Sequence, residues 1–147
     1  MLSADDVARY FLATQPEDAG ETISNLKLQK LCYYAQGFHL ALNDGVALFS
    51  EPIKAWAHGP VIPSLYQAYK GSGDGPIPAP SDVDFDLYDE DTRALLDDVG
   101  EVYGQFSAWK LRNMTHDEPP WQEARKRMEG AEIRNDSMAN YFATLVE

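Results

Sequence analysis

The sequence predicts a mainly α fold, a compact helical bundle of about six helices with a short two-stranded β element after the second helix. Apolar residues recur at spacings of three and four through most of the chain, which is typical of amphipathic helices. Alternating apolar and polar residues occur only in two short runs between residues 47 and 57. The 147 residues suit one hydrophobic core, so we expect a single domain over residues 1–147.

The first two helices carry clear N-terminal signals. Ser3, with Asp6 three positions on, predicts the start of a helix over residues 4–14, and a polar turn is expected at residues 15–20. Ser24 is expected to cap a second helix, which reaches residue 42 and has the wide apolar face of a central core helix.

Gly37 lies inside this second helix, where glycine costs about 1 kcal/mol relative to alanine. We therefore expect a neighbouring backbone or ring to come close to it.

The pattern changes after the Asn-Asp-Gly turn at residues 43–45. Residues 47–49 and 53–57 predict two short strands. A turn at residues 58–60 follows, and Pro60 and Pro63 are both expected in the first turn of a third helix.

The second half of the chain predicts a glycine- and proline-rich loop followed by four helices. The loop covers residues 71–80. The helices are expected from about Asp89 to Phe106, over residues 107–114, over residues 121–128 after two prolines, and in a last segment capped by Asp136.

The charge of the chain limits its partners. A formal net charge of −12 repels nucleic-acid phosphates and anionic lipid headgroups, so we expect neither nucleic acid nor membrane as a partner. No predicted helix has a basic, groove-reading face, which disfavours a DNA-binding regulator. Ten carboxylates between Asp74 and Glu101 face only Arg93, and they form either a solvated loop and helix start or a surface that steers a basic partner.

The sequence also indicates a cytoplasmic protein. Cys32 is the only cysteine, so no internal disulfide is possible, and its helical context predicts a buried structural thiol. Residues 1–10 contain Asp5 and Asp6 and no apolar run, so we expect no signal peptide. No stretch approaches the ~18–20 apolar residues that span a bilayer.

No sequence motif indicates catalysis, so we expect that the chain is not an enzyme and that it binds no cofactor or metal. His39, His58 and His116 lack metal-ligand spacing, and no nucleophile motif is present. The alternative is a small metal- or histidine-dependent enzyme that uses His116, Asp117 and Glu118, an imidazole beside two carboxylates. The opposing interpretation is a helix-terminal histidine that bonds nearby carbonyl groups.

Aromatic residues near the turns are the candidates for partner binding. Tyr33 and Tyr34 project about 100° apart on a helix, so we expect them not to face the same core. A tyrosine left at the surface is a typical protein-binding hot spot. The other interpretation of each ring is packing in the core, since large aromatic residues dominate burial in small domains. Partner contacts are predicted at Tyr33, Tyr34, His58, Tyr66 and Tyr69.

Three segments resemble the Panacea domain family, known also from GepA-like phage-associated proteins. They are residues 26–37, residues 51–66 with the stretch AWAHGPV, and residues 115–121. In order and separation they match the family pattern across nearly the whole chain. Within them, the residues expected to define the fold rather than to contact a partner are Trp56, Gly59, Pro60, His116 and Trp121.

The resemblance implies an antitoxin that is encoded beside a toxin and neutralises it by direct contact. It also implies a second possibility, a proteolytic adaptor that presents the toxin to the ClpXP protease.

Overall fold

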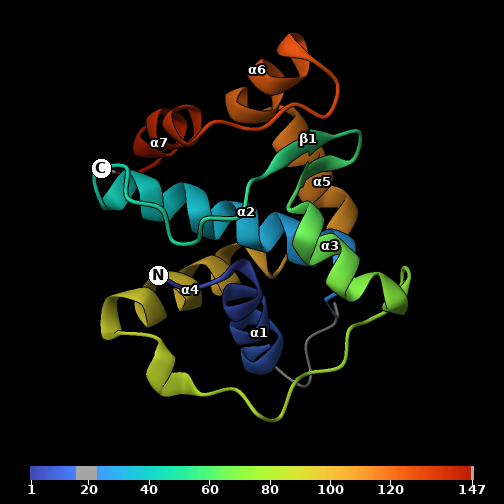
Figure 1. The fold of residues 1–147 in the computed structure, drawn as a ribbon, viewed down its shortest axis with the longest axis vertical. Coiled ribbons are helices and arrows are strands. Elements are labelled where there is room, and N and C mark those ends of the chain that lie inside the picture. The colour runs from blue at the N-terminus through green and yellow to red at the C-terminus, as the bar shows by residue number, and fades with distance from the viewer. Residues whose placement is uncertain (16–22, 147) are drawn as a thin grey trace.

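The structure, a computed structural model, describes residues 1–15 and 23–146. Within these ranges it contains seven α-helices and one two-stranded antiparallel sheet, which confirms the mainly α prediction (Figure 1). The elements are α1 (Ala4–Thr14), α2 (Asn25–Leu42), β1 (Lys54–Trp56), β2 (Gly59–Val61), α3 (Pro63–Tyr69), α4 (Glu90–Tyr103), α5 (Ala108–His116), α6 (Pro119–Arg127) and α7 (Asn135–Ala143), with short 3-10 turns at Lys70–Ser72 and Phe85–Leu87.

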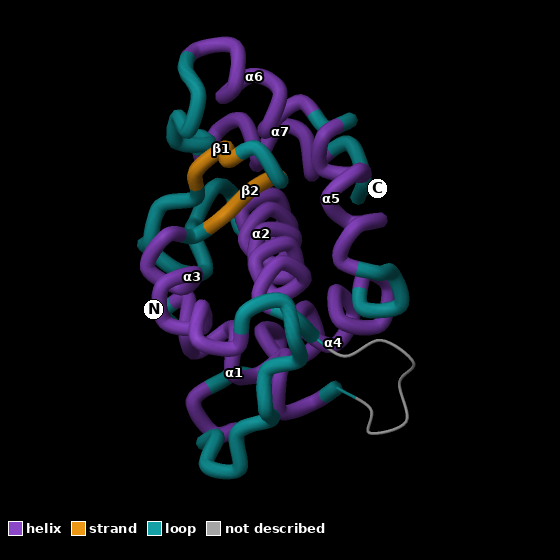
Figure 2. Tube along the Cα trace, turned by 90° about the vertical axis from the view of Figure 1, so that its right-hand side faces the viewer, coloured by secondary structure: helices purple, strands orange, loops and turns teal. Residues whose placement is uncertain are grey.

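Helix α2 is the centre of the fold. Figure 2 looks nearly along its axis and shows the other elements around it. Helices α1, α3, α4, α5 and α7 and strand β2 all contact it. Its buried residues therefore lie on every side of the helix, as expected for a helix enclosed in a core.

Polar side chains on α2 are buried together with the apolar ones, and each has a partner. The amine of Lys27 donates to the Gly104 carbonyl oxygen at 2.6 Å. Gln36 accepts from the backbone N–H groups of Leu48 and Phe49, and donates to the Phe49 carbonyl oxygen at 2.8 Å. These bonds satisfy groups that would otherwise be costly to bury.

Of the three predicted helix caps, the first two are present and the third is not. Ser3 and Asp6 form a capping box at α1, and the Ser24 hydroxyl caps α2. Asp89 caps α4. The prediction that Asp136 caps the last helix is wrong, because the chain is still extended at Arg134 and Asp136 lies inside the first turn of α7. The turn expected at residues 15–20 lies, apart from Gln15, outside the described residues.

The β element sits later in the chain than predicted. Residues 47–49 form no strand, because the backbone of Leu48 and Phe49 bonds to the Gln36 side chain instead. Pro60 does not begin a helix: it lies in β2, paired with Ala55. The helix begins at Pro63, as predicted for that proline.

The segment between α6 and α7 covers the outer edge of β1. The Ala55 N–H donates to the Ala131 carbonyl oxygen at 2.8 Å, and the Ile133 N–H donates to the Ile53 carbonyl oxygen at 2.7 Å. The hairpin is thereby held between α2 and the C-terminal third of the chain. None of the described helices is long and apolar enough to cross a membrane.

Candidate functional site at the hairpin

Residues from three distant segments meet at the hairpin. The indole N–H of Trp121, on α6, donates to the Trp56 carbonyl oxygen at 2.9 Å. The imidazole of His116 stacks on the Trp121 ring with 4.0 Å between centroids and 9° between planes. The guanidinium of Arg125 lies 5.4 Å from the centroid of the same ring. The expected motif residues Trp56, His116 and Trp121 therefore form one cluster.

Gly59 lets the hairpin lie close to α2 and α5. Its φ is +106°, and a Cβ atom there would lie 2.7 Å from Lys30 Cε and 2.8 Å from Thr115 Oγ1. Lys30 is fully buried, and its amine lies 3.3 Å from the Pro60 carbonyl oxygen. Burial lowers the pKa of Lys30 to about 7, and the charge of Arg112 contributes. A side chain at position 59 would displace these groups.

A pocket of about 490 Å³ opens beside the hairpin. Three of its lining residues, Trp56, His58 and Tyr66, were singled out from the sequence. Trp56 and Tyr66 meet edge to face at 5.3 Å, and both are half-buried. Arg125 lines the same pocket from α6. This volume is within the range of pockets that bind small ligands.

Sequence reasoning missed Trp109, which lies beside the hairpin turn. Its side chain is 55% exposed. The His58 ring is 5.9 Å away, and the Arg112 guanidinium lies 4.4 Å from the indole centroid. Leu111 and Thr115 are the buried residues of α5, so helical periodicity could have placed Trp109 on the solvent side. We call Trp56, His58, Tyr66, Trp109 and Arg112 the hairpin surface.

The expectation for the tyrosine pair was wrong. Tyr33 and Tyr34 are both fully buried, and their hydroxyls donate to the two carboxylate oxygens of Glu118 at 3.0 and 2.8 Å. Tyr34 also stacks on Tyr103, with 3.9 Å between centroids. Because α2 is enclosed, directions 100° apart both lead into the core. Neither ring can contact a partner in this structure.

The other predicted partner residues divide between two places. His58 is exposed at the hairpin turn, and Tyr66 lines the adjacent pocket. Tyr69 does not line this pocket: its hydroxyl donates to Asp5 Oδ1 at 2.7 Å and ties α3 to α1. Partner binding by His58, Tyr66 and Tyr69 remains a prediction.

The three residues of the enzyme alternative have different surroundings. His116 packs on Trp121, Asp117 is exposed, and Glu118 is buried against the two tyrosines. Burial raises the pKa of Glu118 to about 7 although the tyrosine hydroxyls oppose the shift, and burial lowers the pKa of His116. Among the described residues, no cluster of three or more His, Cys, Asp or Glu side chains could hold a metal ion.

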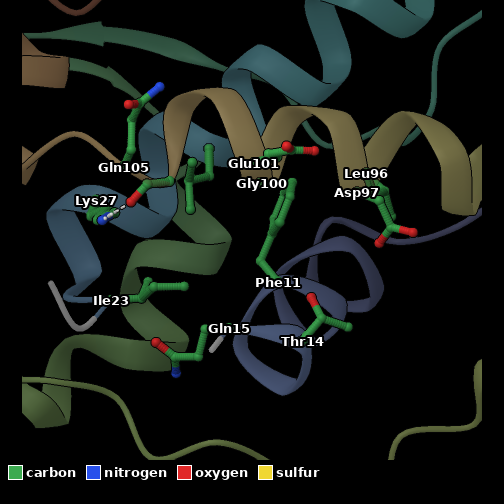
Figure 3. A pocket seen from close by; sticks show the side chains of 12 residues that line it. Phe11, Thr14, Gln15, Ile23, Lys27, Leu96, Asp97, Gly100, Glu101 and Gln105 are labelled. Carbon is green, nitrogen blue, oxygen red and sulfur yellow. Dashed lines mark hydrogen bonds between the residues drawn. The ribbon is translucent and has the colours of Figure 1, made fainter. Parts of the chain in front are cut away.

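A second cleft of about 400 Å³ lies between α1, α2 and α4 (Figure 3). Phe11, Ile23 and Leu96 supply apolar walls, and Asp97 and Glu101 line it from α4. It contains none of the residues that the sequence predicted for partner binding. The hairpin differs from this cleft in that the expected motif residues Trp56, His116 and Trp121 meet there.

A comparison with protein families identifies the class of this chain. Residues 28–122, which include the hairpin, α5 and the start of α6, match the family described as "Antitoxin SocA-like, Panacea domain". The chain therefore belongs to this family of SocA-like antitoxins.

The chain is also similar to one curated protein, "Antitoxin SocA" of Caulobacter vibrioides (strain NA1000 / CB15N). The two are 43% identical over 51 residues. This match covers 35% of the present chain and 27% of the Caulobacter protein, so it spans well under half of either. No solved structure matches the chain.

Proposed function

We propose that this chain is the antitoxin of a bacterial toxin–antitoxin pair, and that it neutralises its cognate toxin by binding it directly through the hairpin surface. Family membership supports the antitoxin role. The observation that carries the choice of surface is Trp109, a large indole that is 55% exposed beside His58 and Arg112.

The composition of the hairpin surface suits a protein interface. Trp, Tyr and Arg are the residues most enriched among binding hot spots. The Arg112 guanidinium packs on the Trp109 ring, so the two side chains present one contact area to a partner. The adjacent 490 Å³ pocket gives room for one anchoring side chain of the partner.

Binding is tested with the product of the neighbouring gene. The tagged chain is co-expressed with that protein, and the complex is measured by light scattering and calorimetry. We expect a stoichiometric complex, and we expect Trp109→Ala to weaken it by about 30-fold or more, the effect of a hot spot of 2 kcal/mol.

The matched control is Val46→Ala. Val46 is 58% exposed and follows the C-terminal end of α2, whereas the hairpin pocket uses the N-terminal end of that helix. The control should bind the toxin like the unchanged chain. Equal binding by both variants would remove the hairpin surface from the interface.

We further propose that the chain delivers the toxin to the ClpXP protease. Delivery predicts a short toxin half-life only when both the chain and active protease are present. A pulse-chase measurement in cells with active and inactive protease tests this step. A toxin that is bound but equally long-lived in all cells would mean neutralisation by occlusion alone.

A further inference from the structure

The hairpin surface lies in a part of the chain that lacks carboxylates. The chain has 24 Asp and Glu residues, yet none lies in residues 23–43, 52–73 or 102–116. These ranges contain α2, the hairpin, α3 and α5. The acidic residues 74–101 belong instead to the loop before α4 and to α4, which lies across α2 from the hairpin in Figure 1.

Basic groups gather where the hairpin turn meets α5. Lys30, His58 and Arg112 all act electrostatically on His116, and each of them lowers its pKa in addition to the larger effect of burial. The side-chain hydrogen bond of Arg112 is to Asn113 Oδ1, a neutral acceptor, at 2.9 Å. Its Nε atom is buried and has no hydrogen-bond partner among the described residues.

Lys110 adds a further cation on α5, one residue from the exposed indole of Trp109. Acidic residues do approach the other side of the hairpin, where Asp74 and Glu129 line the pocket with Arg125. On the α5 side of the surface, Lys110 joins His58, Trp109 and Arg112, and all four residues come from the ranges that contain no Asp or Glu.

We infer that the α5 side of the hairpin surface binds an acidic segment of the partner protein, with Asp or Glu carboxylates on Arg112 and Lys110 and an adjoining apolar side chain on Trp109. This inference rests on the proposed toxin binding and specifies the chemistry of the toxin segment. Complementary charge is what gives such contacts their specificity. A nucleic acid is disfavoured as the partner, because this surface has few cations and the whole chain, with a net charge of −12, repels phosphates.

Carbodiimide cross-linking of the assembled toxin complex tests the inference directly. The carbodiimide converts a carboxylate into an O-acylisourea. A lysine amine in contact attacks its acyl carbon, so that an amide bond forms and the urea leaves. We expect mass spectrometry to find Lys110 joined to an Asp or Glu of the toxin, and no such link at Lys126, an exposed lysine on α6. A complex in which Lys110 remains unlinked would overturn the inference.

Charge reversal gives a second, independent test. Lys110→Glu and Arg112→Glu should each weaken toxin binding by about 10-fold or more, while Lys126→Glu makes the same charge change without effect. Replacing the cross-linked toxin carboxylate by lysine should restore binding to the Lys110→Glu chain. Because Lys110 is exposed, its variant is informative even if Arg112→Glu disturbs folding.

The outcomes separate this inference from the proposed function. If Trp109→Ala loses the toxin but both charge reversals keep it, the toxin is bound and its segment is not acidic. If the unchanged chain forms no complex, the proposed function itself fails. A gel shift of labelled DNA or RNA that Lys110→Glu abolishes would assign the surface to nucleic acid and overturn the inference.

Discussion

The indole N–H of Trp121 donates a hydrogen bond to the backbone carbonyl oxygen of Trp56, 2.9 Å away and 65 positions earlier in the chain. This bond ties α6 to the end of β1. The stacked His116 and the guanidinium of Arg125 hold the Trp121 ring in place. The hairpin surface is thereby fixed to the C-terminal half of the fold.

Trp121→Phe should lower the free energy of unfolding by about 1–3 kcal/mol, because phenylalanine keeps a smaller aromatic ring at this place but has no N–H to donate to the Trp56 carbonyl oxygen. Urea denaturation followed by circular dichroism measures the loss. The control is Trp109→Phe. Because the Trp109 indole is exposed, this substitution should change the free energy of unfolding by less than about 0.5 kcal/mol. Equal effects of the two substitutions would contradict the role of the hydrogen bond.

Gly37→Ala should destabilise the fold although alanine is the better helix former. A Cβ atom at position 37 would lie 2.2 Å from Phe142 Cε2, so either the Phe142 ring or the helix α7 that carries it would have to shift. We expect a loss of about 1–3 kcal/mol in the free energy of unfolding. In Gly100→Ala, within α4, the new atom would meet Phe11 at an ordinary 3.8 Å.

The Gly100→Ala protein should be as stable as the original or more stable by up to about 1 kcal/mol, as helix propensity alone predicts. Chemical denaturation of both proteins gives the comparison. A Gly37→Ala protein as stable as the original would mean that the Phe142 ring can move away at little cost.

Gly59→Ala should disrupt the hairpin more than the same substitution at another glycine with positive φ. At position 59 the new methyl group meets Lys30 and Thr115, whereas at Gly45, with φ +84°, there is nothing within 4 Å. Gly45→Ala therefore isolates the cost of the backbone strain, about 1–2 kcal/mol, from the cost of a steric clash. A larger fall in the melting temperature for Gly59→Ala, together with weaker toxin binding, is the expected result.

Glu118 should make the protein less stable as the pH rises from about 4.5 to 7. Burial raises the pKa of this carboxyl from 4.5 to about 7, so the folded chain holds a proton that the unfolded chain has lost. The contribution of Glu118 to the free energy of unfolding is fully present below pH 4.5. It falls by an amount on the order of 3 kcal/mol between pH 4.5 and pH 7. In Glu118→Gln, the free energy of unfolding should vary less with pH between 4.5 and 7. An unchanged slope in this range would contradict the raised pKa of Glu118.

Lys30 acts in the opposite sense above neutral pH. Burial lowers the pKa of its amine from 10.5 to about 7, so the unfolded chain holds more protons between these values and stability rises with pH. The combined contribution of these two groups to stability is therefore smallest near pH 7. Lys30→Met should remove the rise between about pH 7 and 10, measured by denaturation at a series of pH values.

Much of the helical structure could be predicted because its signals are local. Ser3 and Ser24 cap the first two helices where the sequence places them, and the close approach expected at Gly37 is made by the Phe142 ring. Cys32 is buried, as its helical context predicted. The caps and the burial of Cys32 depend on residues within one helix, whereas for Gly37 the sequence predicted a close approach without showing that Phe142 makes it.

Several errors concern places where another residue takes a hydrogen bond or a position that the local pattern assigns differently. Residues 47–49 have a strand pattern, but the Gln36 side chain takes their hydrogen bonds. Pro60 has a helix-start context, but pairing with Ala55 draws it into the hairpin. Trp109 was overlooked because nothing in its own helix shows that the hairpin turn lies beside it.

By itself, the sequence determined which segments become helices and which residues carry the family pattern, since capping and periodicity act within one or two turns. Only the tertiary structure decided that both tyrosines turn inward to Glu118 and that Trp121 reaches Trp56. Those contacts join residues 65 to 85 positions apart. Their geometry depends on how α5, α6 and α7 pack around α2, because burial is a property of the assembled core and not of one segment.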